Sequence, residues 1–241
     1  MQIVSSAAHN HLLGVLSKSI QDRIFPELEL VELPLGKAVY EAGDKLSHVY
    51  FPVDAIVSLL YVMENGDSAE IAVIGNDGVV GIALFMGGDS SANRAVVQSA
   101  GTAYRLSSAL IKKEFGEHGE VQKLLLRYTQ ALITQMAQTA VCNRHHTIHQ
   151  QLARWLLLSI DRLPDNTVRM TQELIADMLG VRREGVTEAA GHLQQLGIIE
   201  YRRGRIDVLD RTGLERESCE CYQVVETERK RLMAGLVTYK D

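Results

Sequence analysis

The chain lacks several features of secreted and membrane-spanning proteins. Only three of its 241 residues are cysteines, too few for a complete disulfide framework and suited to a reducing compartment. No segment approaches the ~20 consecutive apolar residues of a membrane helix. The N-terminus shows no basic leader followed by an apolar run, so it does not resemble a secretory signal. We therefore expect a cytoplasmic protein with no membrane partner.

Motifs of catalysis are also missing. The chain has no glycine-rich phosphate loop, serine nucleophile elbow or paired catalytic carboxylates in a suitable context. Cys142 with His145 or His146 mimics a nucleophile and its base, but Cys142 falls in a predicted helix seam. We do not expect an enzyme.

Net positive charge is absent as well, since the formal charge is −5. This does not exclude binding to nucleic acid, which needs only a local basic face. Hydrophobic residues make up 46% and charged residues 23% of the chain, as in globular proteins, and the length favours two domains.

The first half of the chain is rich in short β-type runs. Before these runs, Asn10 can cap the start of a helix that Pro26 ends. The pair Asn65-Gly66 suits the tight turn of a hairpin. Many short strands at this spacing predict a small antiparallel barrel or roll. The runs are LELVEL, KAVYE, HVYFPV, AIVSLLYVM, SAEIAVI, GVVGIALF, NRAVVQSA and TAYRL.

A long helical pattern follows, with a heptad-like seam from Val121 to His146. This seam either lies on the chain's own domain or pairs with a second copy. Additional apolar residues favour pairing, because they can satisfy a second surface; they are Leu124, Leu126, Ile133, Met136 and Val141. The predicted dimer interface is Val121, Leu125, Tyr128, Leu132, Gln135, Met136 and Thr139.

Two short helical patterns flank a glycine near the C-terminus. Thr171 can cap the first helix, and Gly180 suits the sharp turn because glycine readily adopts a left-handed backbone. The second helix is expected over residues 182–196. Two helices joined in this way match a helix-turn-helix. The predicted buried residues are Leu174, Ile175, Met178 and Leu179 in the first helix, and Val186, Ala189, Ala190, Leu193 and Leu196 in the second.

An arginine-rich hairpin, or wing, is predicted over residues 198–210, turning at Arg203-Gly204. Arginines at its tip are placed to meet phosphates, while polar residues at the start of the second helix would meet base edges. Between Val181 and Ile206, five arginines against three glutamates leave a local charge of +2. This small surplus favours two subunits gripping DNA together.

The segment TQELIADMLGVRREGVTEAAGHLQQLGIIEYRRGRIDVLD resembles the winged helix-turn-helix of the Crp/Fnr family of bacterial transcription regulators. The resemblance extends from about Leu12 to Asp210. It implies that Arg183 and Glu184 contact base edges, arginine to guanine and glutamate to cytosine. Glu188 stands where many members carry another arginine. The predicted DNA contacts are Thr171, Gln172, Arg182, Arg183, Glu184, Thr187, Glu188, Arg202, Arg203 and Arg205.

The resemblance implies an α+β fold in three parts. These are a cyclic-nucleotide-binding-like antiparallel β-roll (1–118), a dimerisation helix (119–147) and a winged helix-turn-helix domain (148–241). It further implies a homodimeric, sequence-specific regulator of transcription that binds palindromic double-stranded DNA, with RNA polymerase as a further partner. Two other interpretations stay open: a protein-binding scaffold that does not bind DNA, and a small-molecule- or metal-sensing module with a relict winged helix.

The roll departs from the nucleotide-binding pattern of the family. Members that bind cyclic nucleotides hold the phosphate with a Gly-Glu turn and a following Arg-Ser pair. The matching segment, VVGIALFMGGDSSANRAVV, retains Gly81 and Arg94, but Ile82 and Ala95 replace the carboxylate and the serine. The hydroxyl pair that contacts the base falls near Met136. Isoleucine cannot accept a hydrogen bond from ribose, so we do not expect cyclic AMP to bind. These five residues are the candidate effector pocket, and a surface position at a strand end is the alternative for Arg94.

No other cofactor is expected. Iron–sulfur members of the family carry an N-terminal cysteine cluster, and no cysteine precedes Cys142. Cys219 and Cys221 face one way if they lie on a strand, which suggests either a dithiol switch or spare thiols.

The remaining candidates for a metal site are the closely spaced histidines His145, His146 and His149. His145 and His149 share a helical face, yet two ligands make a poor site. Polar packing at a hinge is the alternative, and we predict no metal.

Overall fold

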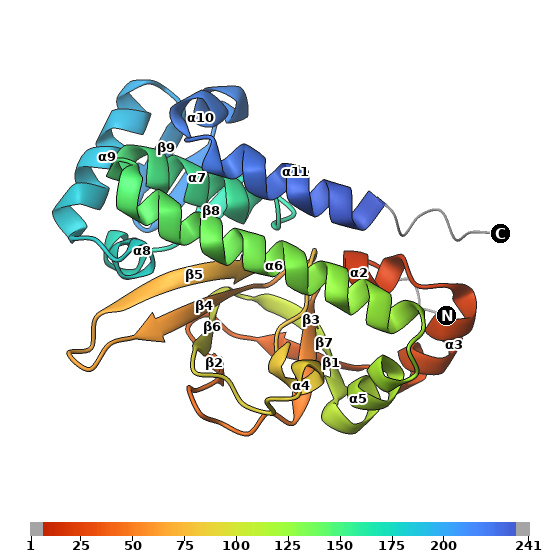
Figure 1. Cartoon of the computed structure of the whole chain (residues 1–241). Helices are drawn as coiled ribbons and strands as arrows, with labels where there is room; N and C mark the ends of the chain where they lie inside the picture. The colour runs from red at the N-terminus through yellow and green to blue at the C-terminus, as the bar shows by residue number, and fades with distance from the viewer. Residues whose placement is uncertain (1–6, 235–241) are drawn as a thin grey trace.

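Two short helices begin the part of the chain that this computed structural model describes, residues 7–234 (Figure 1). As predicted, the Asn10 side chain caps the first, α2 (His11–Gly14), by accepting hydrogen bonds from two backbone N–H groups. The predicted single helix is interrupted before α3 (Lys18–Ile24), and Pro26 lies in the 3-10 turn η1 (Phe25–Glu27) that follows.

The β-rich segment forms two antiparallel sheets, as predicted for a roll. Their strand orders are β1-β7-β3 and β2-β6-β4-β5. The predicted turn at Asn65-Gly66 joins β4 to β5, and Gly66 has a left-handed backbone with φ of 91°. The strands are β1 (Glu29–Leu33), β2 (Ala38–Tyr40), β3 (His48–Pro52), β4 (Ile56–Val62), β5 (Ser68–Ile74), β6 (Arg94–Ser99) and β7 (Gly101–Ser107).

The run GVVGIALF does not form the predicted strand. Val80 makes a single bridge with Tyr50, and the chain then turns into the short helix α4 (Ala83–Met86). Gly81 between them has a φ of 99°, a conformation that glycine tolerates and an extended strand does not. The left-handed backbone at Gly81 therefore ends the extended run.

The long helix α6 (Glu120–His145) follows α5 (Ser108–Gly116) and runs across the roll (Figure 1). The seam predicted as a dimer interface faces the chain's own interior. Val121, Leu125, Tyr128 and Leu132 belong to the core of the roll, and Met136 packs partly against it. Gln135 donates a hydrogen bond to the carbonyl of Val73, and Thr139 accepts one from Arg154.

This placement corrects the prediction. Periodicity identifies which face of a helix is apolar, but it does not identify the surface that covers that face. Here the covering surface is the chain's own roll and the helix that follows α6.

Between residues 148 and 234, the C-terminal part contains five helices and a three-stranded sheet of order β8-β10-β9. Thr147 and Gln150 form a capping box that starts its first helix. The last helix returns alongside α6, near the C-terminal end of the described chain (Figure 1). The elements are α7 (Ile148–Ile160), β8 (Thr167–Arg169), α8 (Gln172–Leu179), α9 (Arg183–Gln195), β9 (Ile199–Arg202), β10 (Arg205–Val208), α10 (Arg211–Glu217) and α11 (Cys221–Ala234).

A second core joins the roll to the C-terminal part. Ile56, Leu60 and Val73 from the roll pack in one cluster with the apolar face of α7. Buried polar contacts add to this interface: Trp155 donates to Glu70 over 3.1 Å, and Arg162 pairs with Asp77 at 2.7 Å. The three-part division therefore stays an interpretation, and its residues 1–6 and 235–241 lie outside the described residues. Within the described residues, every helix is too short or too polar to cross a membrane.

Candidate nucleic-acid interface

The predicted helix-turn-helix is formed by α8 and α9. The hydroxyl of Thr171 accepts a hydrogen bond from the backbone N–H of Leu174 over 3.3 Å and caps α8. Gly180 ends that helix with a left-handed φ of 64°, as the sequence predicts. A side-chain carbon at Gly180 would lie 3.3 Å from the Cβ of Ala69, so the turn rests closely on β5.

The buried face of α9 agrees with the sequence pattern except at its end. Val186, Ala189, Ala190 and Leu193 are buried, whereas Leu196 is 51% exposed because it caps the helix beyond its last turn. In α8, Leu174 is likewise 39% exposed, whereas Ile175 and Met178 are buried. Both leucines were predicted to be buried, and both predictions were wrong.

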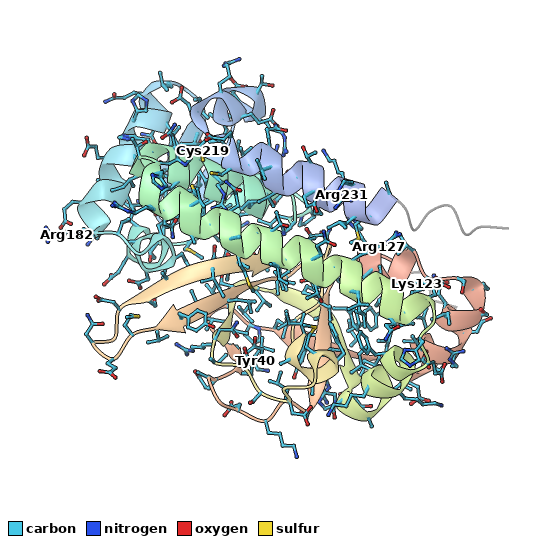
Figure 2. All side chains as sticks on the ribbon, viewed as in Figure 1. Tyr40, Lys123, Arg127, Arg182, Cys219 and Arg231 are labelled. Atoms are coloured by element: carbon cyan, nitrogen blue, oxygen red, sulfur yellow. The ribbon has the colours of Figure 1, made fainter. Side chains whose placement is uncertain are left out.

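The polar residues at the start of α9 are all exposed: Arg182, Arg183, Glu184, Thr187 and Glu188. Arg182 projects from the end of the molecule (Figure 2). The Thr187 hydroxyl donates a hydrogen bond to the side-chain oxygen of Gln172 over 2.8 Å, so this contact ties α9 to the start of α8. An open depression lies between the two helices and the wing, and its lining is Thr171, Gln172, Glu173, Arg183, Tyr201, Arg203 and Gly204.

The wing is a tight hairpin of β9 and β10. Arg203 and Gly204 both have left-handed backbones, with φ of 49° and 77°, as the turn that matches strand twist requires. Arg202 pairs with Glu200. Arg205 pairs with Asp207 at 2.8 Å, and the hydrogen bond from Arg205 lowers the pKa of the Asp207 carboxyl. Two wing arginines therefore already have acidic partners.

Three other arginines in this region form no ion pair within the described residues. Within residues 7–234, no acidic side chain lies within ion-pairing distance of Arg182, Arg183 or Arg203. They surround the N-terminus of α9, whose backbone N–H groups and dipole also favour an anion. This end of the molecule thus offers a cationic surface in an acidic chain.

Sequence reasoning missed Tyr201. Its hydroxyl donates a hydrogen bond to the carbonyl of Met170 over 3.0 Å, and its ring lines the depression beside Arg183. Burial raises the pKa of this phenol. An aromatic residue next to the wing arginines, in the alternation of a strand, was the available signal. Tyr201 fixes the wing relative to the helices.

The residues of the predicted effector pocket lie in different surroundings. Ala95 is buried in the core of the roll, and Ile82 packs against that core. Arg94 occupies the other face of β6, since neighbouring strand residues alternate. It pairs with Glu41 at 2.9 Å and lines a cleft that also includes Val181. Arg94 therefore faces the C-terminal part, not the interior of the roll.

Gly81 remains close to β3, since a side-chain carbon there would lie 3.3 Å from the carbonyl oxygen of His48. Met136 lies on α6, partly buried against the core of the roll.

Two family models match this chain. The model of the cyclic nucleotide-binding domain matches residues 30–118, and the model of the Crp-like helix-turn-helix domain matches residues 150–217. The chain belongs to the Crp/Fnr family. As a family member it is a DNA-binding transcription regulator with a cyclic-nucleotide-binding-like sensor domain.

Relatives in this family include two global nitrogen regulators. That of Synechococcus elongatus is 24% identical over 210 residues, covering 80% of this chain and 95% of the relative. That of a Nostoc species is 25% identical over 192 residues, covering 76% and 86%.

Solved structures of the family share the fold. FixK2 from Bradyrhizobium japonicum superposes with a TM-score of 0.69 at 19% identity, over 80% of this chain and 98% of its own. A CRP-family regulator from Thermus thermophilus gives 0.65 at 18% identity, over 78% and 96%.

Proposed function

We propose that this regulator acts as a homodimer that binds a palindromic DNA site through α9 and the wing, under control of the roll. The observation that carries the proposal is the cluster of three unpaired arginines at the exposed N-terminus of α9, beside the wing. Helix-turn-helix proteins insert this end of the second helix into the major groove.

Base recognition is assigned to Arg183 and Glu184. Both are exposed at the start of α9, where guanine and cytosine edges would be reached. Thr187 and Glu188 lie one turn further along the same exposed face. Thr171 and Gln172 lie at the start of α8 beside the depression and are assigned to positioning contacts with the DNA backbone.

Phosphate contact is assigned chiefly to Arg203 and Arg182. Arg205 and Arg202 have acidic partners, so they must exchange these for a phosphate and gain less. This refines the sequence-based expectation that all wing arginines contribute alike.

Dimerisation is assigned to the face of α6 that the roll leaves uncovered. Leu126, Ile133 and Val141 are 47%, 56% and 48% exposed. Together with the exposed Ala137 and Ala140, they follow the spacing of a coiled-coil seam. Large apolar residues exposed in a row mark an interaction surface.

Control by the roll would pass through the second core and the buried contacts between Glu70 and Trp155. An effector that favours one arrangement of this interface would shift the spacing of the two α9 helices. RNA polymerase is the proposed partner once DNA is bound, and no catalytic step is needed.

The test compares single variants of the full-length protein binding duplex DNA over a range of salt. Arg203→Ala should lower the slope of log affinity against log salt by about one unit for each lost phosphate contact. Arg205→Ala should lower it less. Arg231→Ala is the control, because Arg231 lies on α11, away from the wing (Figure 2).

Equal slopes for the Arg203, Arg205 and Arg231 variants would overturn the proposed docking. A wild-type protein without salt-dependent DNA retention would instead favour the protein-binding scaffold.

A further inference from the structure

All three cysteines of the chain lie close to His146 at the C-terminal end of α6. Cys142 and His146 lie one turn apart at the C-terminal end of α6, and Cys219 and Cys221 lie where α10 gives way to α11. One ligand atom from each of these four residues lies within 4.8 Å of the other three. Cys219 is seen among the C-terminal helices, close to the end of α6 (Figure 2).

The spacing of the four atoms suits a tetrahedral metal ion. The Sγ atoms of Cys142 and Cys219 are 3.5 Å apart, and the Cys221 Sγ lies 3.4 Å from Nδ1 of His146. Zinc–sulfur bonds of about 2.3 Å in a tetrahedron separate two sulfurs by about 3.8 Å. Shifts of a few tenths of an ångström would therefore complete the shell, whereas a disulfide requires the two sulfurs to approach to about 2.0 Å.

The four side chains are enclosed by protein, and the imidazole is held in place. The three cysteines are 0–4% exposed. Nε2 of His146 lies 3.3 Å from a carboxylate oxygen of Glu220, which leaves Nδ1 free to bind a metal, as carboxylate–histidine–zinc arrangements do. Gln138 donates an N–H to the Cys221 sulfur over 3.1 Å.

Charge near the cluster is balanced by Arg154. Its guanidinium is buried, hydrogen-bonded to Thr139 and near enough to Cys142 for a direct electrostatic interaction. Zn²⁺ with three thiolates carries one net negative charge, which a single buried arginine offsets.

We propose that Cys142, His146, Cys219 and Cys221 form a closed structural site for one Zn²⁺ ion per chain. All four positions are filled by protein, as in structural zinc sites. Three thiolates and one imidazole favour Zn²⁺ over hard cations such as Mg²⁺ and Ca²⁺, which prefer oxygen ligands.

The site would stabilise the junction between α6 and the winged helix-turn-helix. His146 directly precedes the capping box that starts α7, and the two other ligands follow α10, which packs on α7. Bound zinc would hold the C-terminal part at a defined angle to α6. This consequence for DNA binding rests on the proposed function, whereas metal binding itself does not.

The proposal departs from the sequence-based expectation of no metal site. His145, which the helical spacing had paired with His149, is exposed. His149 makes an edge-on ring contact with His192, with ring centroids 5.1 Å apart. His146, the residue between them, faces the cysteines.

The experiment measures metal in untagged full-length protein purified under reducing conditions. Elemental analysis should find one zinc per chain. Replacement with Co²⁺ should produce thiolate-to-cobalt charge-transfer absorption and the visible bands of tetrahedral cobalt. His146→Ala and Cys219→Ser should lose the metal to a chelator that leaves the wild type loaded.

Two further variants test whether His146 and its carboxylate partner bind the metal specifically. His145→Ala is the matched control, since it removes a neighbouring exposed histidine and should keep zinc. Glu220→Gln should weaken zinc affinity by about 10- to 100-fold, because the carboxylate orients the imidazole. If a ligand variant fails to fold, the cobalt spectrum and chelator competition of the wild type still decide the matter.

Two outcomes would overturn the site. Metal-free protein with three alkylatable thiols would show spare cysteines. Metal-free protein that forms a Cys142–Cys219 disulfide once the reductant is removed would show a redox pair. DNA binding is measured separately, with and without zinc. A protein that binds DNA but no metal would remove this inference and leave the proposed function standing.

Discussion

Dimer formation can be tested with two adjacent residues of α6 that face different surroundings. Ile133 is 56% exposed in the stripe assigned to the dimer, whereas Leu132 is 2% exposed in the core of the roll. Ile133→Glu should therefore break the dimer and leave the fold intact. Leu132→Ala should weaken the fold and leave the dimer surface unchanged.

The size of both effects follows from burial. Full burial of an isoleucine contributes about 1.5–3 kcal/mol, so covering the exposed 56% in two copies contributes roughly 2–3 kcal/mol. Each ~1.4 kcal/mol is a tenfold change in affinity, so Ile133→Glu should raise the dimer Kd by at least about 30-fold. Leu132→Ala should cost about 2–5 kcal/mol of unfolding free energy.

Sedimentation velocity over a dilution series measures the dimer Kd, and urea unfolding measures stability. The wild type should sediment as two 26.7 kDa chains. The assignment of the interface fails if Ile133→Glu keeps the wild-type Kd. It also fails if Leu132→Ala dissociates the dimer while the protein remains as stable as the wild type.

Further predictions concern the buried interface and the roll. Burial raises the pKa of the Glu70 carboxyl from 4.5 to about 7. The folded protein then holds this proton more tightly than the unfolded chain, so stability from this group is present below pH ~4.5 and falls, by on the order of 3 kcal/mol, as the pH rises to about 7. Glu70→Gln should remove that part of the pH dependence of urea unfolding, and an unchanged profile would contradict the burial argument. Millimolar cyclic AMP should alter neither the Tm nor DNA binding, because Ile82 and Ala95 lack polar side chains; a saturable calorimetric signal at micromolar cyclic AMP would overturn this.

Local signals in the sequence were sufficient to predict the helix-turn-helix and its wing. Gly180 and the Arg203-Gly204 turn each require a left-handed backbone, and this requirement is visible in the residue type itself. The Arg205–Asp207 pair is also local, because residues two apart on a strand share a face, yet that the two side chains form an ion pair is evident only from the structure.

Contacts between distant parts of the chain could not be predicted in this way. Cys142 and Cys219 are 77 residues apart, and only the return of α11 along α6 brings them together. The side of α6 that meets the roll depends in the same way on tertiary packing. The sequence pattern therefore predicts one apolar face as the dimer surface, whereas another face, with Ile133, is the exposed one.

The central claim is tested most directly by selecting DNA from a random duplex library with the wild type and with Arg183→Ala. A two-fold dimer should enrich a palindrome with half-sites ~10 base pairs apart, centre to centre. Arg183→Ala should relax the preference at one base pair in each half-site and cost about 1–3 kcal/mol per half-site. No enriched motif with the wild type, or an identical motif with Arg183→Ala, would contradict recognition by α9.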